Sequence, residues 1–327
     1  TGEPVANAFR KCPNLVMEAP DRAMYKEKSR RLITYLKTYT KEIEQVSIDE
    51  CYMDFTSIAG KYPSCVDAAF EIKNGIREKF GFTVNIGIST NKLLAKMASD
   101  FEKPDKVHTL FPEEIQVKMW PLPIGELYMA GHSSVETLKK LEIQTIGDLA
   151  QADPKMIALH LKSHGKMLWE FANGIDHSLV QSEQTEAKGI GNSTTLSEDA
   201  RTLEEIQQVF DRLADSVGMR LKKAGQKAYM VSMEIKYYDF QTISHQMQLD
   251  RPTNKPQILY ETALRLFKEV WNGEPVRLLG IRTAKLVDET EPEQITIFDV
   301  ELPKPPDEKH KKLNAAVEEL LSLIHIS

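Results

Sequence analysis

The chain has 327 residues, of which 41% are hydrophobic and 28% charged, and its formal net charge is −6. This length predicts two or three domains, and the composition excludes a disordered or fibrous chain. No apolar run reaches the roughly 18 residues that span a bilayer, so no membrane association is expected. The acidic balance alone disfavours nucleic acid, but phosphates respond to local basic patches, so composition leaves that question open. The cysteines Cys12, Cys51 and Cys65 lack CxxC spacing and suit a reducing compartment.

The two ends of the chain differ from those of an intact reading frame. Thr1 opens the chain inside a helix-like pattern, and the apolar letters LLSLIHIS close it. We therefore expect a fragment whose beginning is missing, and we interpret the ending as a cloning or frame scar. Whether LIHIS is native is left open.

Hydrophobic spacing divides the first third of the chain into alternating helices and strands. The predicted elements, in chain order, are helices at 4–12 and 20–39, two short strands within 42–56, a helix at 65–80, a strand at 82–89 and a helix at 91–100. Ser89 and Thr90 are candidate N-caps for the last helix. The order indicates an α/β layer, and the strands within 42–56 break at Asp49 and Glu50.

The rest of the chain separates into a helical part and an α+β part. From about 113 the pattern is one of short helices, and a stretch without periodicity at about 176–193 indicates a linker. The elements expected after it are a helix at 203–224, strands at 228–240 and 242–250, a helix at 256–271 and a strand at 276–287. These predict one sheet covered by two helices, followed from 291 by a tail rich in Pro and charge.

The adjacent acids Asp49 and Glu50 are the first candidates for chemistry. Neighbours on a regular strand point to opposite faces, so both reach one site only where the chain turns. They are either a turn residue and a solvated edge charge, or ligands of a divalent cation such as Mg²⁺, which prefers carboxylate oxygens. Two acids alone cannot hold two ions, so the second interpretation requires a third carboxylate from elsewhere.

Three other stretches have two interpretations each. Lys92, Lys96 and Lys103 follow a strand and accompany a capped helix, where they form a phosphate-binding face or an ordinary solvated one. The stretch LYMAGHSSVETLKKLEIQTIGDLAQ (127–151) is typical of a helix-hairpin-helix that offers backbone amides to nucleic-acid phosphates, or is an ordinary helical corner. The letters QITIF (294–298) form a docking peptide or a further strand.

Taken in order, the stretches SIDECYMDFT, GISTNKLLAKMASDFEKPDK, TIGDLA, KGIGNSTTLSED and PVRLLGIR resemble the motifs of the Y-family, lesion-bypass DNA polymerases. The similarity is greatest to the bacterial DNA polymerase IV (DinB-type) branch and covers residues 1 to about 300. It implies error-prone, template-directed DNA synthesis, by nucleotidyl transfer from a dNTP to a primer 3′-hydroxyl, in DNA repair and replication. It also implies a monomer in the bacterial cytoplasm that binds primer-template DNA.

The resemblance also implies an architecture: a polymerase palm with an antiparallel or mixed sheet, a small helical thumb with a helix-hairpin-helix, and an α+β little finger. The implied boundaries are 1–12 for the end of the fingers, 13–112 for a partial palm without its first strand, 113–177 for the thumb, 178–187 for a linker, 188–290 for the little finger and 291–327 for a tail. Gln294, Ile297 and Phe298 in this tail resemble the peptide by which bacterial polymerases dock on the sliding clamp.

The resemblance assigns roles to single residues. Asp49 and Glu50 are implied to be catalytic ligands of two Mg²⁺ ions, which activate the primer hydroxyl and neutralise the triphosphate. Lys103 is implied to bind the incoming triphosphate, and Lys96 is interpreted as structural. The DNA-backbone contacts implied for the thumb and the little finger are Gly131, Lys236, Thr242 and Ser244.

The chain also departs from the family pattern. Met129 and Glu142 stand where many members have Gly, which leaves the phosphate contact of the hairpin turn in question. The first palm carboxylate of the family is expected before Thr1, so an alternative is a catalytically impaired fragment that binds DNA and the clamp. A two-metal nuclease using the same acids is disfavoured, because no further acid cluster or catalytic His is apparent near the pair.

Overall fold

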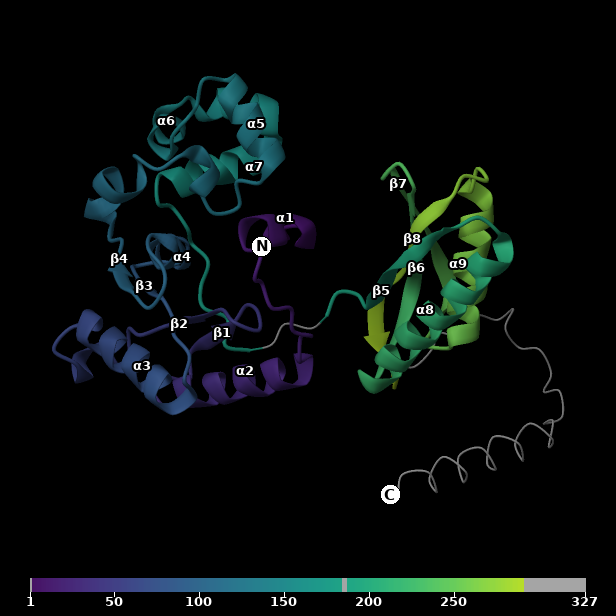
Figure 1. Ribbon diagram of the computed structural model, residues 1–327, viewed down its shortest axis with the longest axis horizontal. Helices are drawn as coiled ribbons and strands as arrows, with labels where there is room; N and C mark the ends of the chain where they lie inside the picture. The colour runs from purple at the N-terminus through teal and green to yellow at the C-terminus, as the bar shows by residue number, and fades with distance from the viewer. Residues whose placement is uncertain (1, 184–186, 291–327) are drawn as a thin grey trace, which may run out of the picture. The chain divides into compact units, whose positions relative to one another are not determined.

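The computed structural model describes residues 2–183 and 187–290, and the chain forms two compact units that divide between residues 184 and 185. The first unit contains helices and two two-stranded sheets, and the second contains one four-stranded sheet and two helices (Figure 1). Among the described residues, no helix combines the length and the apolarity needed to cross a membrane.

The first unit begins with helices and two small sheets. Its first helices are α1 (Val5–Lys11), α2 (Arg22–Leu36), η1 (Ala59–Lys61), α3 (Cys65–Phe80) and α4 (Lys92–Asp100), and its strands are β1 (Ile43–Gln45), β2 (Cys51–Met53), β3 (Ile86–Ile88) and β4 (Val107–Thr109). β1 and β2 pair antiparallel, whereas β3 and β4 pair parallel in a separate sheet. The alternation follows the prediction, except that β4 lies where the sequence predicts no strand.

β1 and β2 form the hairpin expected within 42–56. Gln45 lies opposite Cys51, so Asp49 and Glu50 fall in the connecting turn, as predicted. Ile43 of β1 is 4% exposed and belongs to a core cluster with residues of α2 and α3. The strands are therefore held by apolar packing against two helices, while the turn stays at the surface.

Helix α4 crosses β3 at very close range. An added Cβ at Gly87 would lie 1.9 Å from the carbonyl oxygen of Ala95, so the crossing requires glycine. The N-cap of the helix is Asn91, whose side chain accepts a hydrogen bond from Leu94 N at 2.8 Å. The cap predicted at 89–90 is therefore wrong by one or two residues.

The helical part of the first unit follows β4. Its elements are the short turns η2 (Pro112–Glu114), η3 (Ile115–Met119) and η4 (Ile124–Glu126), and the helices α5 (His132–Lys140), α6 (Ile146–Gln151) and α7 (Pro154–Ala172). α7 is longer than the short helices predicted in this part of the chain, and it is kinked at Lys162, whose φ of 54° is non-helical. Ile157 of α7 and Leu94 of α4 belong to one core cluster. One core thus lies on both sides of the implied palm boundary at 112–113, and that boundary stays a prediction.

The second unit is one antiparallel sheet with two helices (Figure 1). Its elements are β5 (Gly191–Ala200), α8 (Leu203–Lys223), β6 (Gln226–Tyr237), β7 (Thr242–Thr253), α9 (Pro256–Val270) and β8 (Val276–Asp288), and the strand order is β5-β8-β6-β7. The predicted sheet with two helices is confirmed. Strand β5 was missed, and the linker predicted to run to 193 ends earlier, because the letters GNSTTLSEDA are too polar for alternation to appear.

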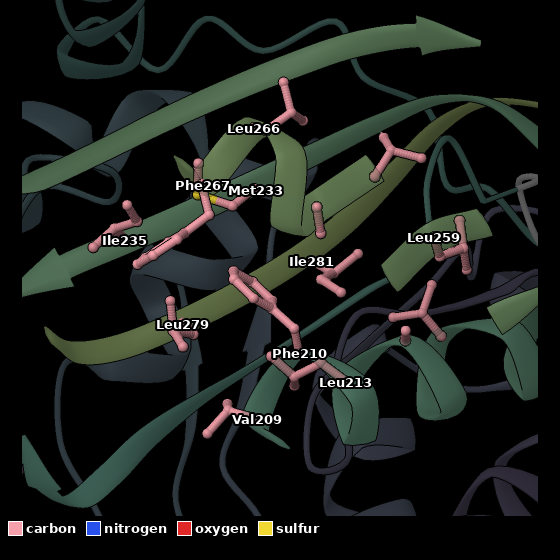
Figure 2. Packing of buried hydrophobic residues seen from close by; sticks show 14 of the residues in the cluster. Val209, Phe210, Leu213, Met233, Ile235, Leu259, Leu266, Phe267, Leu279 and Ile281 are labelled. Carbon is pink, nitrogen blue, oxygen red and sulfur yellow. The ribbon is translucent and has the colours of Figure 1, made fainter. Parts of the chain in front are cut away.

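The core of the second unit lies between its helices and its sheet. Figure 2 shows Phe210 of α8 and Phe267 of α9 together with Ile235 of β6 and Ile281 of β8. The rings of Phe210 and Phe267 meet edge-on with centroids 5.6 Å apart. Because the helices seal one face of the sheet, the opposite face is the one open to a ligand.

Candidate active site

The turn between β1 and β2 is built around the hydroxyl of Ser47. Its Oγ accepts hydrogen bonds from the backbone N–H groups of Asp49 (3.2 Å) and Glu50 (3.0 Å), and it donates one to Asp49 Oδ1 (2.6 Å). The carbonyl oxygen of Glu50 accepts from Val46 N (3.0 Å) and Ser47 N (3.2 Å). Asp49 and Glu50 are both exposed, so the turn presents two adjacent carboxylates at the surface.

A chain of ion pairs links this turn to α4 and the loop after it. Lys96 Nζ lies 2.6 Å from Glu50 Oε1 and 3.2 Å from Asp100 Oδ2. Lys103 Nζ lies 2.7 Å from Asp100 Oδ1. The Lys96 side chain is only 17% exposed, whereas that of Lys103 is 60% exposed. Glu50 and Lys103 are thus the two ends of one network, which we call the ion-pair network; its members are Glu50, Lys96, Asp100 and Lys103.

The charges of the ion-pair network stabilise one another. Burial would lower the pKa of Lys96, but its hydrogen bonds to Glu50 and Asp100 outweigh burial and raise the pKa. Burial would raise the pKa of Asp100, but the two lysines outweigh it and lower that pKa. At neutral pH Lys96 therefore stays cationic beside the acidic turn, and Asp100 stays anionic between the lysines.

Two residues that flank α5 have a glycine-like backbone without being glycine. Met129 has a φ of 69°, and Glu142, after the same helix, has a φ of 63°, both in the left-handed region that favours glycine. Gly131 is the N-cap of α5 and makes no side-chain cap hydrogen bond, and an added Cβ there would meet nothing within 4 Å. The two departures from the family pattern therefore leave the turn open, with the first N–H groups of α5 at the surface.

The open face of the second unit carries Lys236, Thr242 and Ser244. Lys236 of β6 lies opposite Thr242 of β7, and Glu234 lies opposite Ser244 two residues along the ladder. The intervening Ile235 is 0% exposed, in the core under the helices, as the predicted alternation requires. The three predicted DNA-binding residues of this unit therefore share one face of the sheet.

Two family models match the chain. The model of the impB/mucB/samB family matches residues 1–100, and that of the impB/mucB/samB family C-terminal domain matches residues 187–297. The chain is 43% identical over 299 residues to DNA polymerase IV of Clostridium acetobutylicum, an overlap that covers 91% of this chain and 75% of that one. It is 39% identical to DNA polymerase IV 1 of Bacillus subtilis, covering 91% and 72%.

The chain belongs to the Y-family DNA polymerases. Solved structures share the fold: a Y-family polymerase chimera of Dbh and Dpo4 aligns with a TM-score of 0.76 at 23% identity, covering 88% of this chain and 83% of that one. DinB from Sulfolobus solfataricus aligns with a TM-score of 0.53 at 22% identity, covering 86% and 83%. The predicted family, its bacterial DNA polymerase IV branch and the mixed polymerase fold are confirmed. By family, the chain is a DNA-directed DNA polymerase, a nucleotidyltransferase.

The acidic turn of this Y-family polymerase suits the divalent metal that such enzymes use. The carboxylates of Asp49 and Glu50 are exposed, hard oxygen donors of the kind that Mg²⁺ prefers. Across residues 2–183 and 187–290, no group of three or more His, Cys, Asp or Glu side chains gathers to hold a metal. The described residues thus supply two carboxylates, which fit an ion, and the number of ions stays a prediction.

The predicted site residues fall into three places in the polymerase. Asp49, Glu50 and Lys103 lie on or beside the ion-pair network, Gly131 lies at the start of α5, and Lys236, Thr242 and Ser244 lie on the open face of the second unit. The predicted clamp-binding residues Gln294, Ile297 and Phe298 lie outside the described residues. The roles of all of these residues stay predictions.

Ser47 and Asp100 were not predicted from the sequence, although both carry a local signal. Asp100 follows Lys96 by four residues on α4, a spacing at which side chains of a helix meet, and it precedes Lys103 by three residues. Ser47 precedes Asp49 by two residues, and serine hydroxyls in such turns bind the backbone N–H two residues on. A turn-forming hydroxyl beside the acidic pair indicates Ser47, and an i, i+4 ion pair within the predicted helix at 91–100 indicates Asp100, whereas the contact of Lys96 with Glu50 has no local signal.

Proposed function

We propose that the chain performs error-prone, lesion-bypassing DNA synthesis directed by a template. In this reaction the primer 3′-oxygen forms a bond to the α-phosphorus of a dNTP, and the bond from that phosphorus to the β-phosphate breaks, so that pyrophosphate leaves. The observation that carries the proposal is the ion-pair network, because it joins the candidate metal ligand Glu50 to the candidate triphosphate lysine, Lys103. The DNA polymerase IV relatives support the same assignment.

Each residue of the site has a separate task in this proposal. Asp49 and Glu50, with a third carboxylate from elsewhere, would help hold two Mg²⁺ ions, which when bound lower the pKa of the primer hydroxyl and neutralise the triphosphate. Ser47 fixes the backbone of both acids, so their carboxylates need little reordering. Lys103 would bind triphosphate oxygens with its exposed ammonium group, and Lys96 would pair with the Glu50 carboxylate while no metal is bound.

Primer-template DNA would contact both units. Gly131 and the N–H groups that start α5 would bind one backbone phosphate, and Lys236, Thr242 and Ser244 would bind others without reading bases. Replacing Lys236 by Ala should weaken binding equally for all sequences and lower the slope of its salt dependence by about one. From the likeness of residues 294–298 to a clamp-docking peptide, we also propose a sliding-clamp contact, in a protein that is a monomer in the bacterial cytoplasm.

Primer extension with Mg²⁺ tests the proposed function. Asp49→Asn and Glu50→Gln should each slow incorporation, on undamaged and lesion-bearing templates, by about a hundredfold or more, because each weakens charge stabilisation of several kcal/mol. Glu78→Gln, which changes an exposed acid of α3 away from the acidic turn, is the matched control and should leave the rate unchanged. Extension that neither variant of the acidic turn diminishes would end the proposal.

A second candidate is a chain that binds DNA and the clamp but incorporates nucleotides poorly. It is favoured by one observation: among the described residues, no third acid joins Asp49 and Glu50 in a metal-binding group. A site with two carboxylates should hold two ions weakly and turn over slowly. Robust incorporation by residues 1–327 would exclude this candidate, and DNA binding without incorporation would support it.

A further inference from the structure

The loop that joins α4 to β4 carries Lys103 and is pinned on one side by the side chain of Asn85. Asn85 Nδ2 donates hydrogen bonds to the carbonyl oxygens of Ser99 (3.2 Å) and Glu102 (3.1 Å), and Asn85 Oδ1 accepts one from Lys106 N (3.0 Å). These contacts fix the backbone shortly before and after Lys103. The Lys103 side chain remains 60% exposed.

Asp105 pins the same loop from another side. Its carboxylate forms ion pairs with Lys73, at 3.0 Å, and with Arg77, both of which come from α3. Asp105 has a φ of 62°, in a left-handed region that residues with a side chain rarely adopt. The two cations thus hold the loop in a specific backbone conformation, two residues after Lys103.

Lys73 is an unusual residue to find on the packing face of a helix. Its side chain is 7% exposed and is one of the buried residues of α3, where lysine is rarely found without a partner. Asp105, 18% exposed, is the carboxylate that pairs with it. The loop cannot lift away from α3 without leaving a buried ammonium group unpaired, which makes the attachment costly to break.

Four positions held by side chains of other elements, Ser99, Glu102, Asp105 and Lys106, therefore surround one exposed lysine. A free lysine side chain loses much conformational entropy on binding, and a mobile backbone would add to that loss, so a fixed loop improves affinity. We propose that Asp105, held by Lys73 and Arg77, is a positioning residue that presents Lys103 to the triphosphate of the incoming nucleotide. The inference rests on the proposed function, in which Lys103 binds the triphosphate.

Nucleotide affinity on a dideoxy-terminated primer-template tests the inference, because this complex forms without turnover. The full chain with Mg²⁺ is titrated with the correct dNTP, as the unaltered protein and as Lys103→Ala, Asp105→Asn and the double variant. Asn has nearly the shape of Asp and tolerates a left-handed backbone, so Asp105→Asn removes mainly the charge. Each single variant should weaken binding about tenfold. The double variant should bind no more weakly than Lys103→Ala alone.

Two more variants serve as a matched control and as a substitute for Asp105→Asn. Glu102→Gln is the matched control, because Glu102 forms an exposed ion pair with Lys106 in the same loop, and it should leave the affinity unchanged. Arg77→Gln serves if Asp105→Asn does not fold, since Arg77 is 50% exposed and its loss spares the buried Lys73 pair. It should weaken binding several-fold, and only while Lys103 is present.

If the fold-loss of dNTP affinity in the double variant equals the product of the two single losses, Asp105 acts independently of Lys103, on the fold as a whole. That result would overturn the inference. Unchanged affinity of Asp105→Asn and Arg77→Gln beside a weakened Lys103→Ala would overturn it as well, while leaving the proposed function intact. If Lys103→Ala binds normally, or the unaltered chain binds no dNTP, the proposed role of Lys103 fails and the inference fails with it.

Discussion

Glu142 has a backbone conformation that glycine would adopt at a lower cost. Its φ is 63°, its side chain is exposed, and within the described part of the chain it forms no ion pair. A left-handed backbone costs an L-residue about 1–2 kcal/mol. Glycine, in turn, loses about 0.5–1 kcal/mol more chain entropy on folding. The difference predicts that Glu142→Gly stabilises the first unit by about 0.5–1 kcal/mol.

Thermal unfolding of the first unit, followed by calorimetry, measures this gain. A gain of about 0.5–1 kcal/mol should raise the Tm of a unit of this size by about 1–4 °C. Glu142→Ala is the control, because it removes the same carboxylate but keeps a Cβ, and its Tm should stay within about 1 °C of the unaltered chain. If the alanine variant gains as much as the glycine variant, the effect comes from the charge and the backbone argument is refuted.

Met129 shows why the predicted gain in stability on substitution by glycine does not extend to every residue with a left-handed backbone. Its φ of 69° is nearly the same, but its side chain is 52% exposed, so about half of a methionine is buried. Burial of that half contributes about 1 kcal/mol. The loss of packing should offset the backbone gain, and Met129→Gly should be close to neutral in the same calorimetric experiment.

The ion-pair network, a buried thiol and a helix cap each predict a measurable change. Lys96→Met removes the cation that competes for Glu50, so Mg²⁺ should bind several-fold more tightly in titration calorimetry, and weaker binding would contradict this. Burial raises the pKa of Cys51 to about 11, so this thiol stays protonated at pH 8. It should therefore react with a thiol reagent far more slowly than exposed Cys12, and equal rates would contradict this prediction. Asp148 accepts hydrogen bonds from the backbone N–H groups of Thr145 and Gln144 at the start of α6, and these bonds lower its pKa. The stability that the ionised carboxylate gives the fold is therefore full above the ordinary pKa of 3.8 and is lost as the pH falls through the lowered value. Asp148→Asn should therefore cost about 1 kcal/mol in urea unfolding at pH 7 and less in acid, and a pH-independent cost would refute this.

Periodicity predicted the elements that bury one face and missed those shaped by distant contacts. The helices predicted at 203–224 and 256–271 agree with α8 and α9 to within one residue, because each has a continuous apolar stripe. The strand predicted at 82–89 is shorter in the structure, where β3 covers Ile86–Ile88. Asn85 shows the reason: its side chain holds the loop after α4, and no local pattern reveals that contact.

The acidic turn was predictable, whereas the ion-pair network was not. Two short runs of β-forming residues break at Asp49 and Glu50, which is a local signal for a hairpin turn. The contact of Lys96 with Glu50 joins residues 46 positions apart, and it depends on how α4 packs in the first unit. The sequence indicates that Lys96 lies on a helix after β3, but not which side chain that helix brings it to.

The polar strand that periodicity missed completes the open face of the second unit. Thr195 of β5 lies opposite Leu278 of β8, Leu278 lies opposite Lys236 of β6, and Lys236 lies opposite Thr242 of β7. This row therefore has a hydroxyl at each edge and an ammonium group between them, donors that suit phosphate oxygens. β5 has little apolar alternation because its covered face is itself mostly polar: of its residues, only Leu196 and Ala200 join the core. The polar composition that hid β5 from prediction thus also places the hydroxyl of Thr195 at the edge of the open face.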